Sequence, residues 1–507
     1  MTDRSKLKTK LKKIFIFIVS FLLLISILIL VLISCGNKSD DAEESLVGTS
    51  GNTEDDISDD TVIPEDMPRF DNEDYNGRTF MIYYINWSLY KDYYFADSIN
   101  GDYINDAAFN RMQKTNEELN INIQTVTTTS SNDSAEQLAN IRKVVMAGDT
   151  TYDLLLIHNS SDLATYVKDR LILNWNDVPN IDMKKSYWNQ SVTDNMTFAG
   201  MTPFASNDFV LPDVNSIFFN TSMLNNLKLE EPYTLVENKL WTWDKITEMA
   251  SKGSADTNGD GVYNEEDQYG FVGEMGWQFG SIPTSCNQYT VVTGNDGVPV
   301  LNINTPKMSA IIEKINTLIN SGNNAFVWGY SHATDPNVGG ILPISFDNGK
   351  ALFFLVPLSL AKTFRKTEVD FGILPFPKYD EAQDNYISLN WAGFLCIPAS
   401  VSDTGLSGKV TELLAYYSKS TVIPAFYDVV LGQKISRSIE STKMLDIIFN
   451  NTVYDLGIYI GGGIYSITSD MVKSKSNDFA SFYAKNENSW LKTLNDYYIA
   501  NIEYMAD

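Results

Sequence analysis

Histidine and cysteine are scarce in this chain, and each scarcity limits the sites it can build. The 507 residues include only two histidines and three cysteines. Metal sites built from imidazole groups need several histidines. Because His158 and His332 are the only two, a histidine-rich metal centre is excluded. Two of the cysteines, Cys286 and Cys396, could pair with each other. We expect buried free thiols instead, because both lie in apolar segments.

Several catalytic signatures are absent, and basic residues are few. The chain has no nucleophile elbow, no His-Glu-x-x-His motif and no phosphate-binding loop. Lysine and arginine total 38 against 64 aspartates and glutamates, which gives a net charge of −26. A surface this acidic argues against nucleic acid as a partner. The abundant carboxylates leave one alternative open, a glycoside hydrolase with paired catalytic acids.

The N-terminus carries a long, unbroken apolar run, Ile14–Ile33, preceded by basic residues from Arg4 to Lys13. A basic start followed by an apolar stretch and a small residue predicts an export signal over residues 1–35. The ending Leu-Ile-Ser-Cys resembles a bacterial lipobox, in which Cys35 would receive a diacylglycerol. The alternative is an uncleaved membrane anchor, because about 20 apolar residues can span a bilayer. Both interpretations place the rest of the chain outside the cytoplasm and tethered to a membrane.

Residues 36–69 are rich in Asp, Glu, Ser, Thr, Gly and Asn. Such a segment buries too little apolar surface to offset its ordering entropy, so we predict a disordered acidic linker that spaces a domain from the membrane. Residues 70–507 are rich in aromatic and aliphatic side chains. That length exceeds one hydrophobic core and predicts two lobes.

Strand and helix patterns alternate along residues 70–507. A strand, a helix and a second strand followed by a helix predict an α/β lobe with a largely parallel sheet. The second half repeats this alternation, with Thr242 as the expected cap of one helix. The expected strands are 78–85, 121–127, 152–157, 216–219, 351–356, 371–374 and 393–397. The expected helices are 106–119, 134–146, 162–168, 243–252, 308–320, 409–418 and 441–449.

One stretch, DTNGDGVYNEED at residues 256–267, matches the spacing of a calcium-binding loop. Gly261 stands where the loop needs a positive φ. Position 12 is Asp267 where the pattern has glutamate, which shortens its reach. The alternative is an ion-free turn. A single site outside the cell is best interpreted as a structural calcium site that staples a long loop. The expected ligands are Asp256, Asn258, Asp260, the carbonyl of Val262, Asn264 and Asp267.

Four segments together resemble the family 1 extracellular solute-binding proteins, which are substrate-capturing lipoproteins of ABC importers. They are YDLLLIHNSSDLATYVKDRLILNWNDVPNID, WTWDKITEMASKGSADTNGDGVYNEEDQYGF, NGKALFFLVPLSLAKTFRKTEVDFGILPFPKYDEAQDNY and NWAGFLCIPAS. The resemblance implies a periplasmic-binding-protein-like fold of type II, a Venus flytrap of two α/β lobes joined by hinge crossovers. Lobe 1 would comprise 70–208 plus 391–425, and lobe 2 would comprise 209–390 plus 426–507. Cys286 and Cys396 would then lie in different lobes.

Parallel sheets bind ligands beyond the carboxyl ends of their strands. This rule selects side chains after strands and at the crossovers. Their types suit a carbohydrate, because tryptophan stacks on the apolar face of a sugar ring while amide, imidazole and carboxylate groups pair with its hydroxyls. Many relatives have an aromatic residue after the proline equivalent to Pro357, where this chain has Leu358, so one stacking platform is in doubt. The expected ligand-binding residues are Trp87, His158, Asn159, Asp208, Trp277 and Trp391.

The sequence therefore predicts a non-catalytic, lipid-anchored binding protein on the extracellular face of a bacterial, Gram-positive cell membrane. It would capture a sugar or oligosaccharide by hinge closure and deliver it, as a monomer, to an ABC permease. Two alternatives stay open: a surface-anchored, calcium-stabilised glycoside hydrolase, or a carbohydrate adhesin. The alternation of strands and helices disfavours an adhesin, because adhesins tend to be arrays of β-sandwiches.

Overall fold

The computed structural model describes residues 66–70, 74–87, 93–159, 162–328, 345–430 and 439–506. The chain divides into two units, Met1–Ile63 and Pro64–Asp507, and the described residues all belong to the second. The predicted signal segment, Cys35 and most of the acidic linker lie outside them. Within the part of the chain that is described, no helix has the length and apolarity needed to cross a bilayer.

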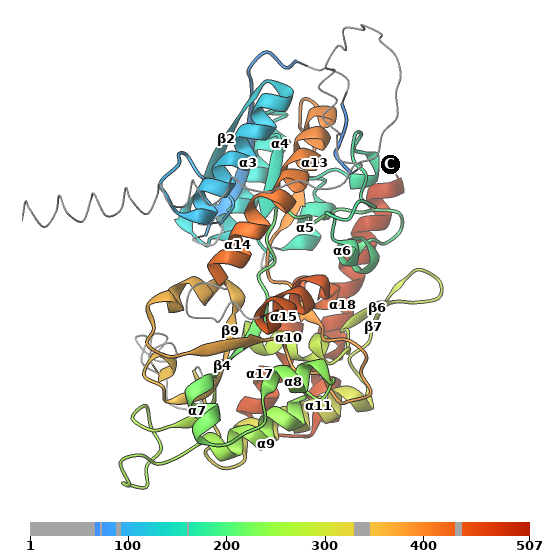
Figure 1. Cartoon of the computed structure of the whole chain (residues 1–507). Helices are drawn as coiled ribbons and strands as arrows, with labels where there is room; N and C mark the ends of the chain where they lie inside the picture. The colour runs from blue at the N-terminus through green and yellow to red at the C-terminus, as the bar shows by residue number, and fades with distance from the viewer. Residues whose placement is uncertain are drawn as a thin grey trace, which may run out of the picture. The chain divides into compact units, whose positions relative to one another are not determined.

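The first sheet has the strand order β12-β3-β1-β2 and lies in the upper part of Figure 1. β1 runs parallel to both β2 and β3, while β12 joins the edge antiparallel to β3. Each following helix begins at an aspartate whose carboxylate accepts backbone N–H groups of the first turn, which is a favoured N-cap. The strands are β1 (Arg78–Asn86), β2 (Ile121–Ser131), β3 (Leu154–Ile157) and β12 (Phe394–Cys396), and the helices are α3 (Tyr103–Leu119), α4 (Ser134–Met146) and α5 (Leu163–Lys168).

The second sheet has the order β10-β4-β9-β5-β8 and lies in the lower part of Figure 1. β5 is parallel to β8 and β9, and β4 is antiparallel to both of its neighbours. Helix α9 lies directly on β5, where an added Cβ at Gly270 would meet the carbonyl oxygen of Ala250 at 1.9 Å. Only glycine permits this approach. The strands are β4 (Asn215–Asn220), β5 (Tyr269–Glu274), β8 (Ala325–Trp328), β9 (Ala351–Pro357) and β10 (Phe371–Leu374), and the main helices are α9 (Trp243–Gly253), α10 (Trp277–Ser285) and α11 (Pro306–Asn320).

Two extended segments of the chain cross between the sheets side by side. Residues 209–214 lead from the first sheet into β4, and residues 390–393 return to β12. The crossovers are bridged to each other through Val214 and Asn390. Next to the bridge, β11 (Ser388–Leu389) pairs in parallel with β13 (Thr452–Val453). After the return, α13 (Thr404–Ser420) and α14 (Val422–Val430) contact α3, while α15 (Ile439–Asn450) contacts β10.

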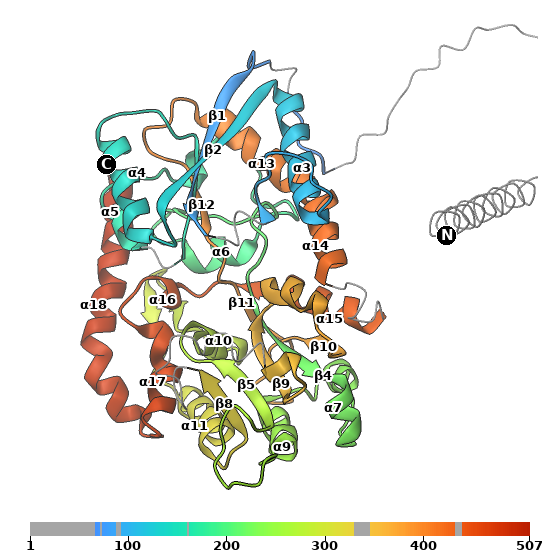
Figure 2. The ribbon, with the colours of Figure 1, turned by 90° about the vertical axis from the view of Figure 1, so that its left-hand side faces the viewer.

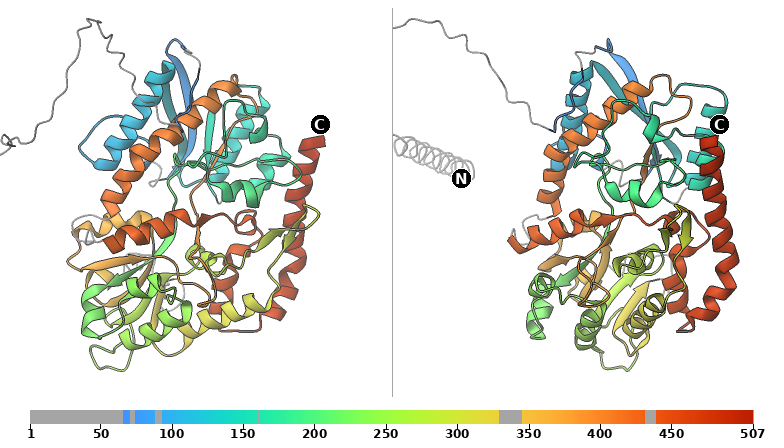
Figure 3. Two further views of the ribbon diagram at one scale, coloured as in Figure 1. Left: turned by 45° about the vertical axis from the view of Figure 1, so that its right-hand side comes forward. Right: turned by 90° about the vertical axis from the view of Figure 1, so that its right-hand side faces the viewer.

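The C-terminal helix α18 (Phe479–Ala506) was not expected from the sequence. It has 28 residues and runs past both sheets, as Figures 2 and 3 show, with contacts to α11 and to α5. Its first half is fixed by Trp490, whose Nε1 donates to the carbonyl of Gly462 at 2.9 Å. Its second half is fixed by Tyr497, whose hydroxyl donates to the carbonyl of Met196 at 3.2 Å. Residues from the predicted lobe 2 therefore also pack on the predicted lobe 1.

The remaining elements are short. They are α6 (Gln190–Met196), α7 (Thr221–Asn226), α8 (Pro232–Glu237), β6 (Val291–Thr293), β7 (Pro299–Leu301), α16 (Leu456–Tyr459) and α17 (Ile467–Lys473), with 3-10 turns at Trp175–Asp177, Leu358–Lys366 and Ile464–Ser466. Cys286 and Cys396 are both buried and free. The residue bounds of the two predicted lobes remain a prediction.

Candidate functional site

Trp391, on the return crossover, is a junction between segments from the whole fold. Its backbone N–H donates to the carbonyl of Asp213 on the first crossover at 2.7 Å. Its indole Nε1 donates to the hydroxyl of Ser281 on α10, also at 2.7 Å. The indole ring meets the ring of Trp277 edge-on, with 5.4 Å between their centroids. Two side chains of α10 therefore hold the crossover against the second sheet.

The first sheet reaches the same junction through the residues that follow β1 and β3. Asn159 donates from its Nδ2 to the carbonyl oxygen of Trp391. Trp87, directly after β1, meets the ring of His158 edge-on at 4.9 Å. Burial lowers the pKa of His158 to about 4, so the imidazole is neutral at physiological pH.

The structure thus gathers five of the six predicted ligand-binding residues, named here the hinge aromatic cluster: Trp87, His158, Asn159, Trp277 and Trp391. Glu274 at the end of β5 lies beside this cluster in sequence, and burial raises its pKa to about 7. Gly276 turns the chain from β5 into α10 with a φ of 110°. That turn makes Trp277 the first residue of helix α10, which is absent from the elements expected from the sequence. The ligand-binding role of the cluster remains a prediction.

Asp208 is separate from the other five. It lines a cavity of about 620 Å³, here called the Asp208 cavity, whose wall includes none of the hinge aromatic cluster. Burial raises the pKa of Asp208 to about 7, although the charge of Lys419 acts in the opposite direction. Asp208, next to the first crossover, and Trp391, on the return crossover, therefore have different surroundings.

Asp213 is a candidate that the sequence analysis missed. Its side chain is only 3% exposed, and its Oδ1 accepts a hydrogen bond from the Ser359 hydroxyl at 2.9 Å. The carbonyl of Ser359 accepts one from the Tyr93 hydroxyl at 2.8 Å, so residues near both sheets meet here. Burial raises the pKa of Asp213 to about 6. The available signal was an acid inside an otherwise apolar run, VLPDVNSIFF. Leu358, at the doubtful stacking position, is fully buried.

The predicted calcium loop is closed by its own hydrogen bonds. Both carboxylate oxygens of Asp256 accept backbone N–H groups, from Gly259 at 2.7 Å and from Gly261 at 2.8 Å. Those of Asp267 accept from Thr257 and Asn264, both at 2.9 Å, and these bonds lower its pKa. The donor set is hard oxygen, which suits calcium. However, among the described residues no three acidic, histidine or cysteine side chains converge as a metal group. Calcium binding therefore remains a prediction.

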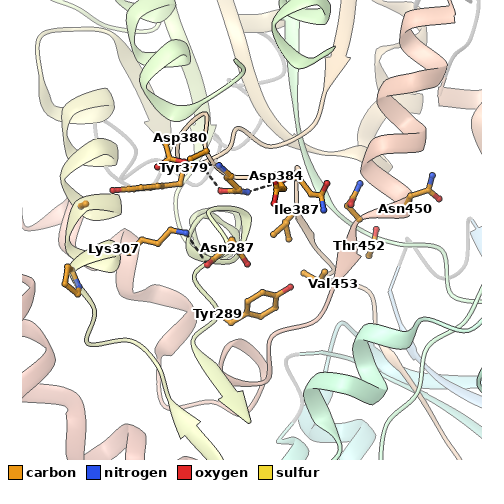
Figure 4. Close-up of a pocket in the computed structure, with 16 residues that line it drawn as sticks. Asn287, Tyr289, Lys307, Tyr379, Asp380, Asp384, Ile387, Asn450, Thr452 and Val453 are labelled. Carbon is orange, nitrogen blue, oxygen red and sulfur yellow. Dashed lines mark hydrogen bonds between the residues drawn. The ribbon is translucent and has the colours of Figure 1, made fainter. Parts of the chain in front are cut away.

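A further cavity of about 970 Å³ lies beside the second sheet, away from every predicted ligand-binding residue (Figure 4). Tyr289 and Tyr379 contribute rings to its wall. Its polar groups largely serve one another: Lys307 donates to the carbonyl of Asn287 at 3.3 Å, and Gln383 bonds three backbone groups. The polar groups of this wall are therefore largely hydrogen-bonded within the protein.

Two of the three comparisons with known proteins find similar proteins. The family model described as "bacterial extracellular solute-binding protein" matches residues 107–429. A search of curated proteins finds no match. Among solved structures, UgpB from Mycobacterium tuberculosis in complex with glycerophosphocholine is 14% identical and has a TM-score of 0.52, with 85% of this chain and 98% of that chain covered.

Two further solved structures are similar. The galacto-N-biose-/lacto-N-biose I-binding protein of the ABC transporter from Bifidobacterium longum, in complex with lacto-N-biose, has a TM-score of 0.51 at 12% identity and covers 86% of this chain and 98% of its own. An ABC transporter solute-binding protein from Thermotoga lettingae bound with α-D-tagatose has a TM-score of 0.51 at 13% identity and covers 82% and 100%. At these identities the likeness supports the fold, and the predicted two-lobed α/β class is confirmed.

Proposed function

We propose a function from this premise: the chain belongs to the bacterial extracellular solute-binding proteins, whose family model matches more than half of its residues. The proposed role is capture of a sugar or oligosaccharide in the hinge aromatic cluster, and its delivery to an ABC importer. The chain would act without catalysis, as a monomer held to the membrane by a lipid on Cys35. The alternative of a glycoside hydrolase or adhesin is weaker, because the family is named for binding solutes.

One observation carries the proposal: both sheets and both crossovers meet at Trp391. Asn159 bonds its carbonyl from the first sheet, and Ser281 bonds its indole from the second. A solute seated against these groups touches both halves. Because a ligand shifts an equilibrium only through its different affinity for the two states, contact with both halves is what lets a solute drive hinge closure.

The chemistry of the cluster favours an uncharged, hydroxyl-rich solute. Trp87 and Trp277 are half-buried indoles that provide flat apolar surface, and the neutral His158 adds no charge. Sugar rings pair such apolar faces with amide and hydroxyl partners. The similar proteins from Bifidobacterium longum and Thermotoga lettingae were solved with lacto-N-biose and tagatose, which agrees with this class.

The test is calorimetric titration with a panel of mono- and oligosaccharides, with product analysis alongside. We expect one or two sugars to bind without turnover, and Trp277→Ala to weaken that binding at least tenfold because it removes one wall of the cluster. Tyr103→Ala is the control, since this aromatic residue is 69% exposed on α3 and is not part of the cluster. Turnover of any sugar, or equal affinity of Trp277→Ala and the parent, would contradict the proposal.

We further propose that loop 256–267 binds calcium as a structural staple. Its supply of hard oxygens and the left-handed φ of 77° at Gly261 support this role. The measurement is the melting temperature with calcium and with chelator. Asp260→Ala should abolish the calcium-dependent rise, while Asp296→Ala, in the turn between β6 and β7, should keep it. If both variants respond to calcium like the parent, the loop is an ion-free turn.

A further inference from the structure

The paired crossover segments have two faces, and each face contacts different parts of the fold. Successive side chains of an extended strand point to opposite sides. Trp391 faces the hinge aromatic cluster and Asp213 faces Ser359, while their neighbours Asn390 and Pro212 line the Asp208 cavity. We call the side of Trp391 and Asp213 the front face, and the side of Asn390 and Pro212 the back face. The Asp208 cavity therefore lies behind the proposed solute site.

The back face holds a buried hydrogen-bond donor with nothing to bind. Asn207 lines the cavity and is 4% exposed. Its Oδ1 accepts the N–H of Phe209 at 3.1 Å, which fixes the orientation of the amide. Its Nδ2 then has no hydrogen-bond partner in the described part of the chain. A buried donor left unpaired is destabilising, so this position gains from an acceptor supplied by a ligand.

An acceptor and a cation lie in the same wall. Asp208 follows Asn207, and no hydrogen bond to its carboxylate is found among the described residues; its backbone N–H donates to Tyr187 at 2.8 Å. Lys419 donates to the hydroxyl of Ser186 at 3.0 Å and lines the cavity from α13. An unpaired donor beside an unpaired carboxyl matches the hydroxyl group, which donates to one and accepts from the other.

Aromatic rings also line the cavity: Trp188 lies beside Asn207, with which it forms an antiparallel bridge, and Tyr427 and Phe449 come from α14 and α15. Tyr427 on α14 stacks on Phe449 on α15 with 5.3 Å between centroids and an angle of 25°. Trp188 is held in the wall by a hydrogen bond from its Nε1 to the carboxylate of Glu412 at 2.8 Å. The cavity thus joins a polar end to flat apolar surface within about 620 Å³, a size in the range of small-molecule sites.

We propose that the Asp208 cavity binds a polyhydroxylated solute, with adjacent hydroxyls bridging Asn207 and Asp208 and the carbon skeleton against Tyr427. This second site is distinct from the hinge aromatic cluster. The cavity in Figure 4 does not compete for this role, because its buried polar groups already have partners.

The position of the cavity adds a consequence that rests on the proposed hinge closure. Its walls come from α13 and α14, which pack on α3 of the first half, and from α15, which packs on β10 of the second. When the two halves close together at the front face, the walls of the Asp208 cavity at the back face move apart. A solute that bridges the back walls therefore opposes closure, and by linkage a front-face sugar must weaken the back-face solute by the same factor.

The experiment uses the whole chain and calorimetric titration with xylitol, sorbitol and glucose as probes. At least one probe should bind, Tyr427→Ala and Asn207→Asp should each weaken it at least tenfold, and Trp277→Ala should leave it unchanged. Asn207→Asp keeps the acceptor for Phe209 and replaces the free donor with a carboxylate oxygen, which also adds an ionisable group beside Asp208. Circular dichroism checks that both variants are folded, and Asn140→Ala is the amide control on α4.

Each outcome decides the proposal. No binding of any probe at 10 mM, or binding lost in Trp277→Ala and kept in Tyr427→Ala, overturns it. If no sugar of the panel binds at the front face, while a probe binds and Tyr427→Ala weakens its binding, the proposed function is wrong and the second site stands. If a front-face sugar leaves the probe's affinity unchanged, the coupling is wrong and the site alone remains.

Discussion

The front and back faces of the crossover strands differ in how they use neighbouring residues. Asn390 is fully buried on the back and spends its amide on the fold: Oδ1 accepts from Asp213 and Ala392, and Nδ2 donates to the Tyr454 hydroxyl. Trp391, on the front, offers a ring edge to other aromatic residues. Adjacent residues can therefore have different roles: Asn390 fixes the path of the crossover, and Trp391 shapes the proposed solute site.

The largest effect that separates the two positions should come from Asn390→Ala. The backbone N–H groups of Asp213 and Ala392 lose their acceptor at once, and the Tyr454 hydroxyl keeps only its bond to Ser206, so we expect the free energy of unfolding to fall by about 3 kcal/mol. Urea denaturation measures this. Trp391→Phe is the matched change on the front and should cost less stability but more sugar affinity, because it keeps apolar volume and removes the indole that bonds Ser281. Equal stability losses in the two variants would remove the distinction.

Local patterns in the sequence predicted the fold well. The helix predicted over 134–146 begins and ends at those residues, because Asp133 caps it and apolar side chains recur on one face. The strand predicted over 371–374 also has those bounds. These are local properties, so a single segment contains the information.

The candidate site was predicted less completely, because its geometry is not local. Asp208 and Trp391 both adjoin crossovers, yet sequence position does not say which face of a crossover a side chain joins. Asp213 was missed because its partner Ser359, and Tyr93, which bonds the carbonyl of Ser359, lie more than a hundred residues away on either side in the sequence. Helix α18 was missed because aromatic residues on several sides of it pack against different parts of the fold, which blurs the apolar stripe.

The next effect concerns pH. Burial raises the pKa of Asp213 from 3.8 to about 6. A carboxyl with a raised pKa disfavours the folded state once it ionises, so the free energy of unfolding falls as pH rises between those values. The loss is on the order of 3 kcal/mol. Asp213→Asn should flatten this part of the stability profile, measured by urea denaturation from pH 4 to pH 8.

Asp208→Asn sharpens the comparison between the faces. Burial raises the pKa of Asp208 to about 7, against the charge of Lys419. The free energy of unfolding should therefore continue to fall at higher pH. Tyr427 is another titratable group beside Asp208. The parent should therefore lose stability in two overlapping steps, and each variant should remove one of them. If both variants keep the parent's dependence of unfolding free energy on pH, neither carboxyl is desolvated in the folded protein.

The smallest effect tests whether the two halves are joined only through the crossovers. Tyr497 on α18 is fully buried and donates its hydroxyl to the carbonyl of Met196, and its ring lies 6.4 Å from that of Phe198. Tyr497→Phe removes the hydrogen bond and keeps the ring, so unfolding should become easier by about 1 kcal/mol. If closure bends this contact, sugar affinity should rise slightly in the same variant. If α18 moves with the first half as one body, affinity should stay constant while stability falls, and the crossovers alone form the hinge.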